Sequence, residues 1–279
     1  MSDLKVACIQ MTSGPAVQEN MVKAGEMIEQ AAIQGAQFIA TPENTGRMLH
    51  SYERKLSDTT PQADNPAIPY FSDIVKNLGV TLLVGSMAVK VSDTQLKNRS
   101  FLFTPDGEVK ATYDKIHMFD VELPTGESHT ESKVIKPGEE AVVTKINDDF
   151  NAGLSICYDL RFAYLYRSLV RAGANILCIP AAFTVPTGKA HWEVLLRARA
   201  IETGSYVIAP AQVGEHDGGR KTYGHSMIID PWGRILAQQE DGEGIIYATL
   251  STEEVDKART AIPTLKHDRD YTVKRYGQE

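Results

Sequence analysis

The sequence predicts an α/β domain with mixed sheets, and three observations support this prediction. In both halves of the chain, apolar runs of strand length alternate with stretches that carry apolar residues at helical spacing. Gly and Pro turns join some neighbouring strands directly, which indicates antiparallel hairpins. No linker-like change of composition interrupts the chain, so we expect one domain over residues 1–279.

In the first half, helical spacing and glycine stops define the helices. Val17–Gln34 carries an apolar stripe and ends before Gly35, and Ala67–Leu78 ends before Gly79. The turn 105–107 (Pro-Asp-Gly) combines a fixed φ with a residue that accepts a positive φ, so it predicts a hairpin. The strands expected here are Lys5–Gln10, Phe38–Ala40, Val80–Val89, Arg99–Thr104 and Glu108–Tyr113.

In the second half, the longest predicted helix is Lys189–Thr203, in which Glu193 and Arg197 form a favourable i,i+4 pair. Ser251 and Glu254 have the spacing of a capping box, which predicts a last short helix. The other elements expected are the helix Tyr164–Ala172 and the strands Ala141–Ile146, Ala152–Ile156, Asn175–Pro180, Tyr206–Pro210, Gly224–Asp230, Ile235–Gln238 and Gly244–Leu250.

Composition narrows the classes of function. The formal net charge is -7 and no Lys/Arg run occurs, so we expect no nucleic-acid partner, and an anionic substrate would need local cations. No apolar run is long enough to span a bilayer, so we expect no membrane partner. The three cysteines form no CxxC pair, which argues against a disulfide framework or a zinc knuckle and favours a reducing, cytoplasmic location. We expect no metal and no cofactor.

Three reactive side chains come directly after strand-like runs. They are Glu43, Lys115 and Cys157, and the carboxyl ends of strands are where ligands gather in α/β sheets. Each has an ordinary alternative, namely a surface carboxylate, an edge-strand charge or a buried structural thiol. Cys157 stands where an apolar run meets polar residues, which suits a nucleophile with a nearby cation that lowers its pKa. Cys8 and Cys178 lie inside apolar runs, so we expect them in the core.

Together these positions resemble the nitrilase superfamily. Glu43 in TPEN, Lys115 in YDKIHMFD and Cys157 in ICYDLRF match its Glu-Lys-Cys triad in order and type. The resemblance continues through residues 180–207, 223–233 and 262–271. It is greatest to the branch that contains the deaminated glutathione amidases and the omega-amidases.

The resemblance implies a four-layer α-β-β-α sandwich of the nitrilase type, with two facing mixed sheets and outer helices. It also implies a homodimer or higher homo-oligomer that pairs through helices. The polar tail over about residues 262–279 is expected to pack on a partner subunit.

The resemblance further implies acyl transfer through a thioester. Glu43 is then the general base, Cys157 the nucleophile, and Lys115 with the backbone N–H of Tyr158 the oxyanion donors. A second glutamate beside the triad matches Glu131. Glu127 is the rival assignment for that role. We expect the pKa of Glu43 to be raised, so that a group titrates between about pH 5 and 8.

The expected substrate is a small amide of a 2-oxo acid. The resemblance implies that Arg161 grips the substrate carboxylate and that Phe183 and Thr187 line the acyl pocket. The alternatives are an ion pair of Arg161 with Asp159 or Glu202, core packing for Phe183, and a helix N-cap for Thr187.

The leading reaction is cleavage of deaminated glutathione to 2-oxoglutarate and cysteinylglycine. The alternatives are an omega-amidase acting on 2-oxoglutaramate and a non-catalytic binding protein on the same fold. Arg220 and Lys221, in a Gly-rich loop, are candidate cations for the glycine carboxylate of the larger substrate, although such a turn is usually a solvated loop.

Two other hydrolase classes fit the sequence less well. The seven histidines are scattered, with no zinc-binding motif. A papain-like Cys–His enzyme would need His191 or His225 at Cys157, but no papain-type signature surrounds that cysteine.

Overall fold

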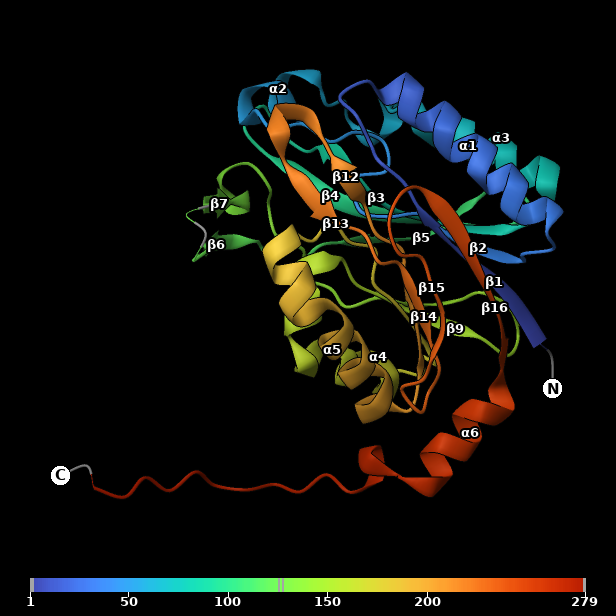
Figure 1. The fold of residues 1–279 in the computed structure, drawn as a ribbon, viewed down its shortest axis with the longest axis vertical. Coiled ribbons are helices and arrows are strands. Elements are labelled where there is room, and N and C mark those ends of the chain that lie inside the picture. Colours follow the sequence, from blue (N-terminus) through green and yellow to red (C-terminus); the bar gives the residue numbers. More distant parts are fainter. Residues whose placement is uncertain (1–2, 125, 127, 278–279) are drawn as a thin grey trace.

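The computed structural model describes residues 3–124, 126 and 128–277. Two sheets face each other, with helices on both outer sides (Figure 1). The helices α1 (Val17–Ile33) and α3 (Ala67–Leu78) cover one sheet, and α4 (Ala163–Arg171) and α5 (Val185–Thr203) cover the other. The predicted α-β-β-α sandwich is therefore confirmed.

The first sheet has the order β16-β1-β2-β3-β4-β5. The pairs β1/β2 and β2/β3 are parallel, whereas β1/β16, β3/β4 and β4/β5 are antiparallel, so the sheet is mixed as predicted. Its strands are β1 Asp3–Gln10, β2 Phe38–Ala40, β3 Thr81–Lys90, β4 Leu96–Phe103, β5 Val109–Asp114 and β16 Gly244–Ser251.

The second sheet has the order β15-β14-β11-β10-β9-β8. It has a parallel centre, β9/β10/β11, and antiparallel pairs on both sides. Its strands are β8 Val143–Lys145, β9 Asn151–Leu154, β10 Ile176–Cys178, β11 Tyr206–Ala209, β14 Met227–Ile229 and β15 Ile235–Gln238.

The side chains of β1 show how the core is divided. Val6 and Cys8 pack in the cluster between the two sheets, whereas Ala7 and Ile9 pack in the cluster under α1 and α3. Successive strand residues point to opposite faces, so a sheet covered on both sides is apolar at nearly every position. The nearly continuous burial of β1 therefore agrees with its position inside the first sheet, between β16 and β2.

The start of one predicted helix and the predicted cap of another are wrong. The helix α5 begins at Val185 rather than Lys189, because Pro186 fits the first helical turn, where its missing N–H costs nothing. The last helix, α6 (Thr252–Ala261), lacks the reciprocal capping box. The Ser251 hydroxyl accepts from the N–H of Glu253 at 3.3 Å, while the carboxylate of Glu254 lies 3.0 Å from Lys257 Nζ.

Three small elements were not predicted, and they all lie beside the cavity described below or close to it. The helix α2 (Tyr52–Asp58) has no buried residue, so it carries no apolar stripe to reveal it. The other two are the hairpins β6/β7 and β12/β13, whose strands are Asp120–Glu122, Ser128–Thr130, Val213–Glu215 and Lys221–Tyr223.

The C-terminal segment leaves the body of the protein after α6 (Figure 1). Tyr271, Val273 and Tyr276 are almost fully exposed there. Within the described residues, no helix combines the length and the apolar character needed to cross a membrane.

Candidate active site

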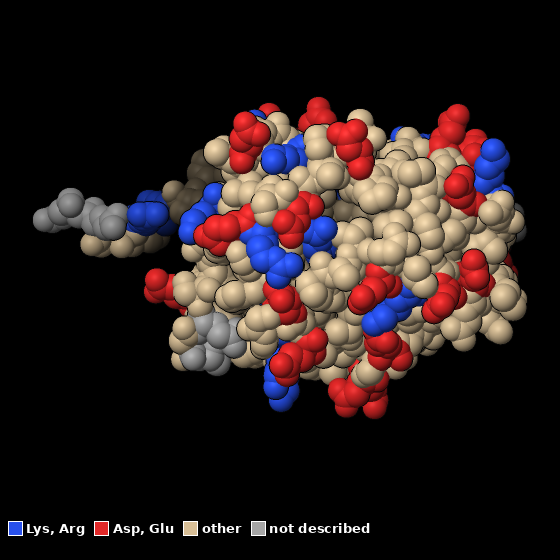
Figure 2. Space-filling view, turned by 90° about the horizontal axis from the view of Figure 1, so that it is seen from above, with Lys and Arg blue, Asp and Glu red and all other residues tan. Residues whose placement is uncertain are grey.

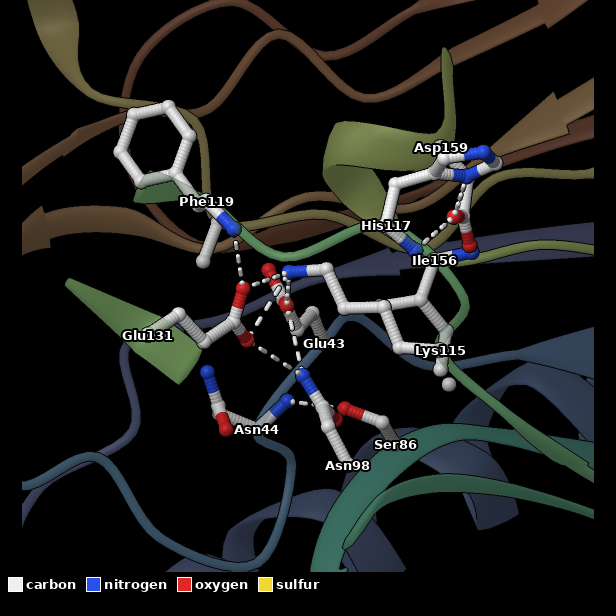
Figure 3. Close-up of polar contacts among 12 residues, drawn as sticks. Glu43, Asn44, Ser86, Asn98, Lys115, His117, Phe119, Glu131, Ile156 and Asp159 are labelled. Atoms are coloured by element: carbon white, nitrogen blue, oxygen red, sulfur yellow. Dashed lines mark hydrogen bonds and ion pairs between the residues drawn. The ribbon is translucent and has the colours of Figure 1, made fainter. Parts of the chain in front are cut away.

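Four segments of the chain bring four reactive side chains together, and three of these segments directly follow strands of the two sheets. Glu43 follows β2 and Lys115 follows β5 in the first sheet, and Cys157 follows β9 in the second. The Nζ atom of Lys115 lies 3.0 Å from Oε1 of Glu43 and 2.8 Å from Oε2 of Glu131 (Figure 3). Lys115 and Glu43 are buried, and Cys157 lines the same cavity.

Cys157 sits on a tight turn at the end of its strand. Its φ of 51° is in the left-handed region, which non-glycine residues rarely adopt unless the surroundings hold them there. The backbone N–H of Cys157 donates to the carbonyl of Pro180 at 2.9 Å. The thiol side chain is only 7% exposed, and that exposure faces the cavity.

A buried carboxylate, Asp159, fixes the turn. Its Oδ2 accepts from the N–H of Ile156 at 2.8 Å and from the hydroxyl of Tyr113 at 2.7 Å. Its Oδ1 accepts from the backbone N–H of His117 at 3.0 Å and lies 2.7 Å from the Nδ1 of that ring (Figure 3). The carboxylate thus ties the Cys157 turn to the segment that follows Lys115.

Backbone contacts also hold the loop that carries Glu43. Asn44 has a φ of 59°, and its N–H donates to Ser86 Oγ at 2.9 Å. The Gln212 side chain donates to the carbonyl of Glu43 at 2.9 Å. These contacts aim the carboxylate at Lys115.

Gly85 lets two of these loops meet. A Cβ atom at this position would lie 2.0 Å from the carbonyl oxygen of Thr41 and 2.5 Å from Cβ of Pro180. Real Cβ atoms do not approach that closely, so only glycine fits here. The Glu43 loop and the strand end that supports Cys157 therefore depend on this residue for their spacing.

Glu131 is held as firmly as Glu43. Its Oε2 accepts from the backbone N–H of Phe119 at 2.8 Å. The side-chain nitrogen of Asn98, in β4, lies 2.9 Å from Glu43 Oε1 and 3.4 Å from Glu131 Oε1. Sequence reasoning missed Asn98, because its neighbours Lys97, Arg99 and Ser100 in β4 are also polar and nothing in the pattern distinguishes it. The rival glutamate, Glu127, lies outside the described residues.

The pKa shifts of Glu43 and Cys157 are opposite in direction to those expected from the sequence. Burial raises the pKa of Glu43, but the Lys115 ammonium and hydrogen bonds from Cys157 and Lys115 outweigh burial, so the net pKa is lowered. The expected raised pKa of Glu43 is therefore wrong. Burial and the charge of Glu43 raise the pKa of the Cys157 thiol well above its ordinary value, although Lys115 acts against them. The resting pair is thus a thiol beside a carboxylate, with no thiolate.

Lys115 keeps its charge in this environment. Burial lowers its pKa, but the negative charges of Glu131 and Glu43 raise it further than burial lowers it, so the net pKa is well above ordinary. The backbone N–H of Tyr158, next to the thiol, donates to no backbone or side-chain acceptor in the described part of the chain. This N–H is therefore available to an oxygen atom bound near the Cys157 sulfur, and the charged Lys115 lines the same cavity.

The site opens into a cavity of about 1100 Å³ that Arg161, Phe183 and Thr187 also line. The guanidinium of Arg161 lies over the rings of Tyr158 and Phe183, at 5.7 and 5.5 Å. The alternative ion pairs of Arg161 are not formed: the carboxylate of Glu202 lies 2.9 Å from Arg199, and Asp159 accepts from the neighbours described above.

The structural alternatives for Phe183 and Thr187 differ in how they compare with the structure. Phe183 packs on Trp192, with ring centroids 4.8 Å apart, and also lines the cavity, so packing and exposure to a ligand coexist. Thr187 is not an N-cap, because α5 begins two residues earlier. Its hydroxyl lies 2.8 Å from that of Thr184.

The residues needed by other hydrolase classes lie elsewhere. Neither His191 nor His225 lines the cavity with Cys157. The ring of His225 stacks on Tyr223, with centroids 3.9 Å apart, and His191 contacts Arg161. Cys8 and Cys178 are fully buried, which confirms their predicted place in the core.

Comparison with known proteins agrees with this arrangement. The family model described as carbon-nitrogen hydrolase matches residues 5–260. The chain is 42% identical over 270 residues to a deaminated glutathione amidase of Synechocystis sp., a match that covers 96% of this chain and 98% of the relative. It is 37% identical over 271 residues to a deaminated glutathione amidase of Mus musculus, covering 95% and 83%.

Solved structures show the same fold. The C. elegans NitFhit protein superposes with a TM-score of 0.89 at 34% identity, over 96% of this chain and 66% of that longer chain. Saccharomyces cerevisiae Nit3, described as a member of branch 10 of the nitrilase superfamily, gives a TM-score of 0.83 at 29% identity, over 94% of each chain. The chain therefore belongs to the carbon-nitrogen hydrolase family of the nitrilase superfamily and is an amidohydrolase.

Proposed function

We propose that this amidohydrolase cleaves deaminated glutathione to 2-oxoglutarate and cysteinylglycine through a thioester on Cys157. The observation that carries the mechanism is the position of the Lys115 ammonium, 3.0 Å from Glu43 and 2.8 Å from Glu131, in the cavity that Cys157 also lines. A carboxylate, a thiol and a fixed cation are what nucleophilic acyl transfer requires.

In the first step, Glu43 takes the proton of Cys157 as the sulfur attacks the amide carbonyl. The lowered pKa of Glu43 and the raised pKa of Cys157 support this order, because the base is ionised and the thiol is protonated before substrate arrives. Lys115 and the N–H of Tyr158 then stabilise the oxyanion. One such donor typically lowers the barrier by about 3 kcal/mol.

In the second step, the C–N bond breaks and Glu43 returns its proton to the leaving amine. The acyl half remains on the sulfur as a thioester. Glu43 next takes a proton from a water molecule, which attacks the thioester, and the acid leaves as the thiol is restored. Glu131 holds Lys115 in place, with its two carboxylate oxygens 3.0 and 2.8 Å from the Nζ atom.

Two observations support deaminated glutathione as the substrate. The curated relatives at 42% and 37% identity carry that activity in their names, over nearly the whole chain. Arg161, which lines the cavity, has no carboxylate within ion-pair distance among the described residues, so it is available to the carboxylate of a 2-oxo acid. Phe183 and Thr187 then line the acyl half.

A side-by-side assay of deaminated glutathione, 2-oxoglutaramate and glutathione tests the proposal, with Cys157→Ser as the blank. We expect turnover of the first amide and none of glutathione, whose amino group replaces the 2-oxo group. Rapid acid quenching should trap an acyl adduct on Cys157, detected by mass spectrometry. Absence of both turnover and adduct would overturn the proposal.

The outer face of α5 supports a homodimer or higher homo-oligomer. Val194 and Ile201 on that helix and the nearby Trp232 are each more than half exposed, and apolar patches of this kind mark contact surfaces. The exposed aromatic residues of the C-terminal segment support its packing on a partner subunit. Light scattering of the native chain and of Val194→Glu tests this, because a charge at the interface should release monomers.

A cytoplasmic location completes the proposal. The three cysteines are free, and free thiols persist in reducing compartments. Fractionation of cells that make the native chain tests this location.

A further inference from the structure

Several basic side chains line the cavity, and they differ in whether a carboxylate lies close to them. Arg47 lies 3.5 Å from Asp58, Lys221 lies 3.5 Å from Glu215, and Lys115 lies between its two glutamates. Lys55, Arg161 and Arg220 also line the cavity, but none has a carboxylate within ion-pair distance in the described part of the chain. On the face seen in Figure 2, by contrast, acidic and basic side chains are interspersed.

Lys55 and Arg220 come from the small elements that the sequence did not predict. Lys55 lies on α2, with Nζ 5.3 Å from the centroid of the Tyr52 ring. Arg220 lies in the loop of the β12/β13 hairpin, and its Nη2 donates to the carbonyl of Ala182 at 3.0 Å. The Nε of Arg220 is buried and has no hydrogen-bond partner among the described residues.

The loop and the helix are packed to bring these two cations together. The N–H of His50, just before α2, donates to Asp217 Oδ2 at 3.1 Å. Gly218 has a φ of 72°, and a Cβ atom there would lie 2.5 Å from Cβ of His50. The hairpin loop therefore sits directly on the segment that leads into α2, with Lys55 and Arg220 both facing the cavity.

Both cations come from segments tied to the loop that carries Glu43. The helix α2 follows that loop in the chain, and the β12/β13 hairpin begins directly after Gln212, whose side chain donates to the Glu43 carbonyl at 2.9 Å. Arg220 is among the charges that lower the pKa of Glu43. Burial lowers the pKa of Lys55, the charge of Arg220 lowers it further, and Glu131 and Glu43 oppose the shift. Arg161 instead packs over Tyr158 and Phe183. Two like charges held near each other without a counter-ion form a site that a bound anion would stabilise.

We infer that Lys55 and Arg220 bind the carboxylate at the far end of the leaving group and so select amides with an anionic leaving amine. The inference rests on the proposed function, because Glu43 must protonate the leaving nitrogen and the leaving group therefore extends over its side of the site. Arg161 is then the cation of the acyl half. The cavity of about 1100 Å³ has room for both halves of such a substrate.

This assignment separates two reactions that share an acyl half. Cysteinylglycine carries a carboxylate that reaches Lys55 and Arg220, whereas the ammonia released from 2-oxoglutaramate carries none. The expected cation pair in the loop, Arg220 with Lys221, is replaced by Arg220 with Lys55, because Lys221 is exposed and paired with Glu215.

The test compares three amides with one acyl half: deaminated glutathione, its C-terminal glycinamide, and 2-oxoglutaramate. We expect the native enzyme to prefer the carboxylate over the glycinamide, and Lys55→Gln and Arg220→Gln each to lower kcat/KM for deaminated glutathione by about 10- to 100-fold. Both variants should leave the other two amides within about threefold. Arg54→Gln, on the same helix but outside the cavity and exposed, is the matched control.

The outcomes distinguish the inference from the function on which it rests. Equal loss for all three amides in the variants would assign a structural role and overturn the inference. Equal cleavage of deaminated glutathione and its glycinamide by the native enzyme would also overturn the inference. The proposed amidase activity would not be affected by that result. A native enzyme that cleaves none of the three would overturn the proposed function and this inference together.

Discussion

The side-chain nitrogen of Asn98 lies 2.9 Å from Oε1 of Glu43, and the same nitrogen lies 3.4 Å from Glu131. A residue in the middle of β4 thus spaces the two carboxylates that flank Lys115. Strands move less than loops, so this contact ties the loop that carries Glu43 to the rigid part of the sheet.

Asn98→Leu should lower kcat about tenfold or more with little change in KM, because it removes a hydrogen bond to a buried charge. The measurement is steady-state kinetics on deaminated glutathione. Asn98→Asp should be worse, since a third carboxylate would repel the other two. If Asn98→Asp were as active as the native enzyme, the spacing role of Asn98 would be wrong.

The profile of kcat/KM against pH should be flat between about pH 5 and 8.5. Glu43 must be ionised, and its lowered pKa puts the acid limb below the ordinary glutamate value of about 4.3. Cys157 and Lys115 must be protonated, and their raised pKa values put the alkaline limb above the ordinary thiol value of about 8.5. A group that titrates in kcat/KM near pH 6 would contradict this charge state.

Lys115→Met should reverse how stability depends on pH. In the native protein the lowered pKa of Glu43 contributes stability above about pH 4.3, the pKa of unfolded glutamate, and this contribution is lost as pH falls through the folded pKa. Without the cation, burial and the neighbouring Glu131 carboxylate raise the pKa of Glu43 above the unfolded value. The variant should then lose stability as pH increases through that raised pKa.

Urea unfolding at pH 5 and pH 7 measures this change. Removing one partner of a buried ion pair costs about 3–5 kcal/mol, and we expect the larger loss at pH 7. Lys257→Met removes an exposed lysine paired with Glu253 and serves as the control, with the same stability as the native chain at both values of pH. Equal losses at pH 5 and pH 7 in Lys115→Met would show that the two carboxylates are not coupled through it.

Gly85→Ala should both destabilise the protein and lower its activity. The added Cβ would lie 2.0 Å from the Thr41 carbonyl, so the loop carrying Glu43 must move, at a cost of about 1–3 kcal/mol typical of overpacking. Thermal unfolding and kcat/KM measure the two effects. Gly14→Ala is the matched control, because its nearest neighbouring atom would be 3.9 Å away. Full activity in Gly85→Ala would contradict the close packing of the two loops.

The main strands and helices and the central residues of the candidate site could be predicted from the sequence because each has a local signal. Apolar runs and glycine stops mark the main strands and helices. Glu43, Lys115 and Cys157 each follow such a run, and strand ends place side chains at the edge of a sheet. Resemblance to a known superfamily then supplied the four layers, which periodicity alone did not show.

Other parts of the site had no local signal. Lys55 lies on a helix without a buried residue, so no apolar stripe marked that helix. The role of Asn98 depends on a contact 55 positions away in the chain. The direction of the pKa shift of Glu43 depends on its distance to Lys115, because burial alone raises that pKa and only a close cation lowers it.

The three cysteines lie in different environments, and this difference allows the fraction of active enzyme in a preparation to be measured. Cys8 and Cys178 are sealed in the interior, and only Cys157 reaches the cavity. A substrate-like acylating reagent whose thioester resists hydrolysis should therefore modify one sulfur per folded chain, and the mass shift would give the fraction of competent molecules in a preparation. Simple alkylating agents should react slowly in the same test, because the raised pKa of Cys157 leaves little of the reactive thiolate.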